Sequence, residues 1–302
     1  MLEQPIKKKR KDVSSGWFVA SLFVPFGIIS FIFFNGTQVG GILMSFQKDI
    51  SGQTIWTFGN YTRIITEGFS TNGIFTESVR NSLLFFSLSM FVMTPINLVI
   101  GYFLHKKITG YKFFRIVLYL PNVLPGLIVA TLFKYITAPD GAGVLASLFY
   151  KMGKEFPNLF GDSRYAIWSL LFYSFWSGFG SGFLLYASAM KRIPPEVLES
   201  AQLDGVGWIR EITSIYMPLI WPTFSMMLIQ MLPSIFESSG AVLFFTQGDY
   251  GTQTLSYWMF EQVKDRTNLN YSAAVGLFFS IITLPILFFS RWLLEKVPDV
   301  EY

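Results

Sequence analysis

Six long apolar runs divide this chain, and they limit its possible folds more than any other feature. Each run is long enough, as a helix rising about 1.5 Å per residue, to cross about 30 Å of hydrocarbon. Only 14% of the residues are charged, whereas soluble domains average about 25%. We therefore predict an all-α integral membrane protein with about six transmembrane helices. The predicted spans are Trp17–Phe46, Ser82–Leu104, Phe114–Ile136, Tyr165–Met190, Leu219–Phe245 and Tyr271–Leu294.

The polar segments between these runs predict how the chain is organised. Lysine and arginine favour cytoplasmic loops, and most of the 23 basic residues lie in segments that a cytoplasmic amino terminus would place inside. The first run follows Lys7 to Lys11 without a small-residue cleavage site, so we expect an uncleaved first helix. The expected parts are a basic cytoplasmic tail (1–15), the first transmembrane helix (16–46), an extracytoplasmic segment (47–80), a core with five transmembrane helices (81–295) and a second cytoplasmic tail (296–302).

This sequence lacks the residues that several classes of chemistry require. The chain has no cysteine and a single histidine, His105, which we interpret as a solvated or snorkelling residue at a membrane boundary beside two lysines. No GxxxxGK[ST] loop is present to bind nucleotide phosphates, and the basic residues do not form a face for nucleic acid. We expect no catalytic residues, no metal site and no cofactor. The energy for any transport must then come from a partner or an ion gradient.

The polar segment between the fourth and fifth runs, residues 191–218, is the most informative part of the chain. Pro194 and Pro195 suit the start of a helix, where a missing N–H costs little. Glu199 continues that helix, and Gly205 offers a left-handed end. A second helical stretch, Gly207–Tyr216, leads to the next span. We predict two short helices with a sharp corner at the cytoplasmic membrane surface, available to a protein partner.

The sequence ESAQLDGVGWIREITSIYMP resembles the EAA loop of binding-protein-dependent ABC importer permeases. Serine and valine replace the alanine that the family usually has at positions 200 and 206. The resemblance implies the type I importer permease fold, with Glu199 and Asp204 making polar contacts in an ATPase cleft while Ala201 and Gly205 permit close approach. The matching positions are Glu199, Ser200, Ala201, Asp204, Gly205, Ile215, Met217 and Pro218.

The resemblance extends over nearly the whole chain to the MalF-like group of sugar-importer permeases. The segments FFRIVLYLPNVLPG and WSGFGSGFLLYASAMKRIPPEVLESA are similar to that group's third and fourth helices, whereas QGDYG replaces its frequent GGP. The group implies a bacterial inner-membrane permease with both termini in the cytoplasm. Its expected partners are a second permease, which we expect to be a different chain, two ABC ATPase subunits, an extracytoplasmic binding protein and a sugar.

A separate hypothesis concerns the path of the solute through the membrane. An ionisable residue inside a span is costly and usually faces a cavity or a partner, and Glu237 is the clearest example. Alternatively, Glu237 is hydrated near the outer end or pairs with the other permease, and the aromatic residues only pack. The candidate path residues are Glu237, Gln230, Ser238, Ser239 and Asn122, with Trp176 or Tyr186 stacking on a sugar ring.

Other solutes and other energy sources stay open at this point. The EAA loop is shared with importers of non-sugar solutes such as peptides and polyamines. An ion-coupled secondary transporter would work without an ATPase, but the sequence has no relay of several intramembrane carboxylates that would support it.

Overall fold

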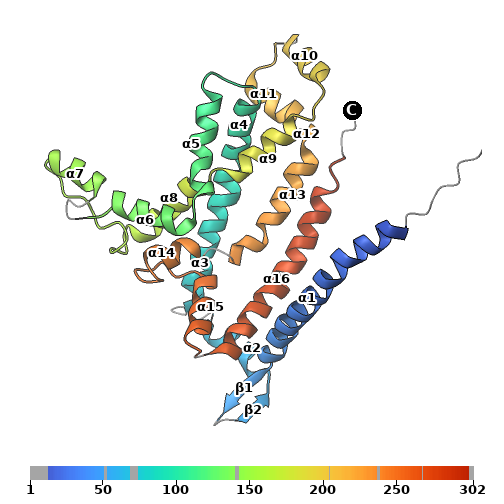
Figure 1. Ribbon diagram of the computed structural model, residues 1–302. Coiled ribbons are helices and arrows are strands. Elements are labelled where there is room, and N and C mark those ends of the chain that lie inside the picture. The colour runs from blue at the N-terminus through green and yellow to red at the C-terminus, as the bar shows by residue number, and fades with distance from the viewer. Residues whose placement is uncertain are drawn as a thin grey trace, which may run out of the picture.

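The computed structural model describes residues 13–50, 53–68, 74–139, 143–203, 205–236, 239–266 and 268–298, and these are mostly helical. The first predicted span is a single helix, α1 (Val13–Ser45), which continues through the more polar second half of the run. It lies along α16 (Leu269–Leu294), the last helix of the chain (Figure 1).

A short β-hairpin follows α1 and departs from the all-helical prediction. Its strands are β1 (Gln47–Ile50) and β2 (Gln53–Trp56), paired in antiparallel register. The amide of Asn60, in α2 (Gly59–Arg63), donates hydrogen bonds to the carbonyls of Ser45 and Gln47 at 3.0 and 2.9 Å. These bonds hold the hairpin at the end of α1. A π-helix, η1 (Ile64–Gly68), follows α2.

The second span is one continuous helix that widens in its middle. It consists of α3 (Ile74–Ser87), the π-helix η2 (Leu88–Met93) and α4 (Thr94–His105). Pro95 lies just after the π-helix and has no N–H to donate to the preceding turn. This missing donor accounts for the local change of helix geometry within a run that stays uninterrupted.

The third predicted span is two helices rather than one. The helix α5 (Tyr111–Val123) meets α6 (Gly126–Ile136) at a bend of 106°. Leu124 and Pro125 have extended backbone at the corner, because a residue before proline avoids the helical conformation. As a result α6 and the amphipathic helix α7 (Val144–Lys151) form an arm that projects from the bundle (Figure 1).

The fourth and fifth predicted spans are also divided. The fourth contains α8 (Ala166–Gly178) and α9 (Ser181–Met190), separated at Phe179 and Gly180. In the fifth, the stretches Trp208–Leu219 and Trp221–Phe236 meet at an angle of 84°, and the α-helix gives way to a 3₁₀-helix at Pro233. The helices between residues 195 and 264, which include this span, are α10 (Pro195–Leu203), α11 (Trp208–Glu211), η3 (Ile212–Tyr216), α12 (Met217–Leu219), α13 (Trp221–Met231), η4 (Pro233–Phe236), α14 (Gly240–Phe245) and α15 (Leu255–Lys264).

Among the described residues, three helices are long and apolar enough to cross a membrane: Gly16–Ser45, Phe75–His105 and Leu269–Leu294. The two bent pairs raise that number to as many as five. The helix α10 stands at one end of the molecule, near the end of α16, and the hairpin stands at the other (Figure 1). The chain is therefore a multi-pass membrane protein.

The buried side chains form four clusters along the bundle. The cluster nearest α10 joins α4, α9 and η3 around Tyr102, Tyr186 and Tyr216. The cluster at the opposite end joins η1, α3, α15 and α16 around Phe75 and Trp258. Smaller clusters lie between them. The core therefore ties both ends of the second span to other helices.

Candidate functional site

The helix α10 ends as the sequence predicts. Gly205 has a φ of +67°, which a glycine adopts without a steric penalty. The N–H of Val206 donates to the carbonyl of Ala201 at 3.4 Å, which is the six-to-one bond of a Schellman helix end. The turn between α10 and α11, at residues 205–207, is called the EAA corner below. Its conformation is thus set by residues of the EAA segment (199–218) itself.

The EAA segment presents a mixed polar and apolar surface. Glu199 and Ser200 are exposed, and the side chain of Leu203 is 89% exposed. A Cβ added at Gly205 would meet no atom within 4 Å, so this corner is open to a partner. Ala201 is buried against the rest of the chain, and Asp204 lies outside the described residues.

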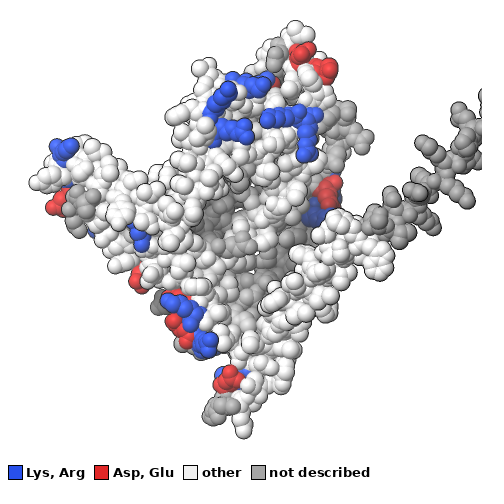
Figure 2. Space-filling model, viewed as in Figure 1, with Lys and Arg blue, Asp and Glu red and all other residues white. Residues whose placement is uncertain are grey.

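Acidic and basic residues lie in separate places around this segment. Figure 2 shows acidic residues at the end of α10, and Glu196 and Glu199 are the exposed acids of that helix. Basic residues cover the neighbouring helix ends in the same view. The exposed basic residues at the ends of α4, α5 and α9 are Lys107, Lys112, Arg115, Lys191 and Arg192.

A buried ionic cluster lies directly behind the EAA corner, and the sequence did not predict it. Glu211, at the end of α11, is 5% exposed. Its carboxylate lies 2.6 Å from the Nζ of Lys106 and accepts a hydrogen bond of 2.6 Å from the hydroxyl of Tyr102. His105, expected to be solvated or snorkelling, is partly buried, and its ring meets that of Tyr216 edge to face with centroids 5.5 Å apart. Burial of these groups depends on tertiary packing, which leaves no local signal.

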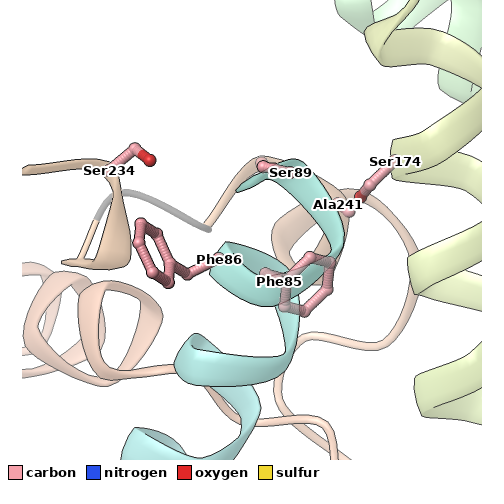
Figure 3. Close-up of a pocket in the computed structure, with 7 residues that line it drawn as sticks. Phe85, Phe86, Ser89, Ser174, Ser234 and Ala241 are labelled. Atoms are coloured by element: carbon pink, nitrogen blue, oxygen red, sulfur yellow. The ribbon is translucent and has the colours of Figure 1, made fainter. Parts of the chain in front are cut away.

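A pocket of about 330 Å³ lies between α3–η2, α8 and the η4–α14 region (Figure 3). Two phenylalanines and three serines contribute to its lining, and no charged residue is among the described residues that line it. Ser234 and Gly240 flank Glu237 in sequence, but Glu237 and Ser238 lie outside the described residues. The described lining is Phe85, Phe86, Ser89, Ser174, Ser234, Gly240 and Ala241.

Asn122 does not line this pocket but bridges two helices. Its amide donates to the carbonyl of Ser177 at 3.1 Å and also to the carbonyl of Phe179. Both carbonyls lie where α8 gives way to α9, so they lack helical partners. A Cβ at Gly180 would lie 2.6 Å from the Asn122 amide nitrogen. Asn122 therefore holds the end of α5 against this break.

The other predicted path residues are dispersed. Trp176 packs against Phe133 of α6, with ring centroids 5.6 Å apart. Residues two positions apart in a helix point in nearly opposite directions, so Trp176 points away from the pocket that Ser174 lines. Tyr186 is 1% exposed within the core beside α4. Gln230 faces a separate groove of about 500 Å³ between α13 and α16, and Ser239 precedes α14. In this conformation four of the five described candidates, Asn122, Trp176, Tyr186 and Gln230, do not share one cavity.

The pocket residues could have been suspected from one sequence signal. Ser87 and Ser89 interrupt an apolar run directly after two phenylalanines, and polar groups inside a span usually face the protein interior. The serines at 174 and 234 come from other runs. Their convergence depends on how the broken helices fold back, which no local pattern encodes.

A multi-pass helical bundle with an internal pocket and a protruding helical corner defines a membrane component of a solute transporter. Residues 93–297 match the family described as "Binding-protein-dependent transport system inner membrane component". This match covers more than half of the chain, so the chain belongs to that family.

Relatives from several bacteria match over most of their length. The multiple sugar-binding transport system permease protein MsmF of Streptococcus mutans is 26% identical over 285 residues, covering 90% of this chain and 93% of its own. The arabinooligosaccharides transport system permease protein AraP of Bacillus subtilis is 22% identical, covering 87% and 83%. The sn-glycerol-3-phosphate transport system permease protein UgpA of Salmonella typhimurium is 25% identical, covering 97% and 99%.

A solved structure supports the same fold. A chain of a bacterial ABC transporter that imports the acidic polysaccharide alginate superposes with a TM-score of 0.81 at 22% identity, covering 95% of this chain and 98% of that one. A second structure, of the alginate transporter with an alginate pentasaccharide-bound periplasmic protein, also gives a TM-score of 0.81. The predicted importer permease fold is confirmed.

Proposed function

We propose that this chain is a permease subunit of an ABC importer that carries a sugar or oligosaccharide. The observation that carries the proposal is the pocket of two phenylalanines and three serines. Aromatic faces suit the apolar faces of a sugar ring, and hydroxyl groups suit its polar edge. MsmF, AraP and the alginate importer are named for carbohydrates, which supports the same choice.

A phosphorylated or otherwise charged solute is the second candidate, because UgpA is named for sn-glycerol-3-phosphate and the alginate importer for an acidic polysaccharide. The described pocket lining argues for the neutral sugar. A buried anion needs a cationic or strongly donating partner, and no lysine or arginine is among the described residues of this pocket.

The proposed complex divides the work among several chains. A binding protein delivers the sugar from outside, this chain and a second, different permease enclose the path, and two ATPase subunits grip the EAA corners from inside. Closure of the ATPases moves α10, and the membrane helices then alternate between outward-open and inward-open arrangements. The hydrolysis of ATP belongs to the partner subunits, so this chain is not an enzyme.

The orientation of the chain is part of the proposal. The bacterial cytoplasmic membrane is its location, with both termini and residues 191–218 inside. The basic residues at the ends of α4, α5 and α9 support this choice, because lysine and arginine favour cytoplasmic loops. Residues 47–80 and α7 then lie outside, where the binding protein docks.

The test is a double substitution in the EAA corner of the assembled complex. Glu199→Lys with Gly205→Asp is expected to abolish ATPase co-purification and sugar uptake, because it reverses one exposed charge and adds a second at an open corner. The charge reversal Lys154→Glu, at an exposed position in the loop after α7, is the control and should leave assembly intact. Wild-type uptake by the double variant would contradict the proposal.

The solute is tested separately from the coupling. The partner binding protein is identified by co-purification and screened against sugars and glycerophosphates by thermal shift. A selective shift with a sugar, followed by uptake of the same sugar into proteoliposomes, is the expected result. Selective stabilisation by a glycerophosphate would favour the second candidate.

A further inference from the structure

Behind the EAA corner, a pair of opposite charges joins two elements that are distant in sequence. Glu211 belongs to α11, which follows the corner, and Lys106 directly follows α4, the end of the second span. Their charged atoms are 2.6 Å apart, and the two side chains are 7% and 24% exposed. The pair is therefore shielded from the solvent that weakens surface ion pairs.

Aromatic residues surround this pair on several sides. The hydroxyl of Tyr102 donates to the second carboxylate oxygen of Glu211 at 2.6 Å. The Nζ of Lys106 lies 5.7 and 5.9 Å from the ring centroids of Tyr102 and Tyr216, within reach of a cation–π attraction. Those two rings meet edge to face at 5.3 Å. Each charge consequently has more than one partner, and the partners come from both elements.

Such a pair fixes position more than it adds stability. Removing two charges from water costs about as much as their attraction returns, so apolar side chains would pack as well. An apolar contact, however, tolerates sliding, whereas a shift of one helical turn would leave both charges unpaired, with the Glu211 carboxylate still buried. The pair therefore holds α11 and α4 in one register.

The second span extends from this pair to the pocket. Phe75–His105 is one continuous helix, and its residues Phe85, Phe86 and Ser89 line the pocket. Ser89 and Lys106 are separated by about 25 Å of helix at about 1.5 Å per residue. A displacement of the EAA corner that reaches Lys106 thus reaches the pocket wall through a single continuous helix.

We propose that Glu211 and Lys106 form a permanent joint that transmits the movement of the EAA corner into the second span. This inference rests on the proposed function, since it assigns the route by which an ATPase would act on the pocket. Both are positioning residues: neither touches the pocket, and each acts through α4.

The first experiment separates ATP hydrolysis from uptake in the full complex, reconstituted in proteoliposomes. Glu211→Gln retains the size of the side chain and an acceptor for Tyr102, and Lys106→Met retains the apolar stem. Each is expected to lower the sugar transported per ATP by about tenfold or more, because it leaves the other residue of the pair without its opposite charge. The swapped variant Lys106→Glu with Glu211→Lys should recover most of that ratio. A purely structural pair would lower hydrolysis and uptake together.

The outcomes distinguish this inference from the proposed function. If the wild-type complex shows no ATP-dependent uptake, the proposed function fails. If the wild type transports and Glu211→Gln transports equally per ATP, only the joint is overturned. Failure of the swapped variant to recover coupling, although it assembles with the ATPases, would also overturn it.

A second experiment applies even if the single variants do not fold. The chain has no cysteine, so Lys106→Cys with Glu211→Cys can be joined by a short bifunctional thiol reagent after the complex is assembled. A permanent joint predicts that the cross-linked complex transports at least as much sugar per ATP as the same variant without the reagent. Continued ATP hydrolysis with uptake blocked by the cross-link would show that the two elements must separate, and would overturn the proposal.

Discussion

The need for a left-handed backbone at Gly205 can be tested separately from steric contacts. Its φ of +67° is the left-handed conformation, yet no atom lies within 4 Å of an added Cβ. Alanine there costs about 1–2 kcal/mol through backbone strain, whereas asparagine adopts this conformation more readily. We expect Gly205→Asn to retain more ATPase binding and uptake than Gly205→Ala, measured by co-purification and transport.

The order of these two variants identifies what the corner requires. If the ATPase contact needs the absence of any side chain, asparagine will be worse than alanine, because it is larger. That result would contradict a requirement for backbone conformation and would place the constraint in the interface.

Single residues differ in how well the sequence predicts them. Gly205 was predicted correctly because a helix end is set by neighbours within a few positions. Glu211 was not singled out, since nothing local marks it as buried and its partner Lys106 is distant in sequence. Asn122 stays a candidate for the solute path, but the hydrogen bonds of its amide at the α8–α9 break could not be predicted, because their partners are distant in sequence.

Among the elements, the close packing of α4 on α9 depends on Gly101. A Cβ there would lie 3.0 Å from the Phe183 carbonyl oxygen and 3.0 Å from the Tyr186 Cβ. Gly101→Val must therefore separate the helices, and overpacking of this kind costs about 1–3 kcal/mol. We expect a lower Tm for the purified complex, measured by thermal unfolding in detergent.

The matched control is Gly27→Val in α1, where an added Cβ meets no atom within 4 Å. This substitution makes the same chemical change within a helix but should leave the Tm close to the wild-type value. Equal losses at both positions would mean that valine acts through the helix backbone rather than through the α4–α9 contact.

The elements themselves were predicted where apolar length decides them. The helices α1 and α16 match their runs closely. The run Phe114–Ile136 was predicted as one span, but the 106° bend between α5 and α6 depends on what each half packs against. The hairpin was missed because its segment is short and polar, and α15 because its ten residues are too few to span a membrane.

For the whole molecule, the proposed orientation predicts which surfaces a reagent reaches. Lys154 and Ser200 are both exposed and lie in segments assigned to opposite sides. Because the chain has no cysteine, one can be introduced at each position. We expect a membrane-impermeant maleimide to label Lys154→Cys in intact cells and Ser200→Cys only after permeabilisation. The reverse pattern would invert the topology.

The helices α1 and α16 lie side by side although they are the first and last spans of the chain. About 220 residues separate them, and synthesis at about 5–20 residues per second takes on the order of 10 to 50 s. During that interval α1 has only lipid or the insertion machinery beside it. Even in the finished fold, no residue of its most apolar stretch is buried. The order of biosynthesis therefore requires α1 to be stable in the bilayer as a single helix until α16 has been synthesised.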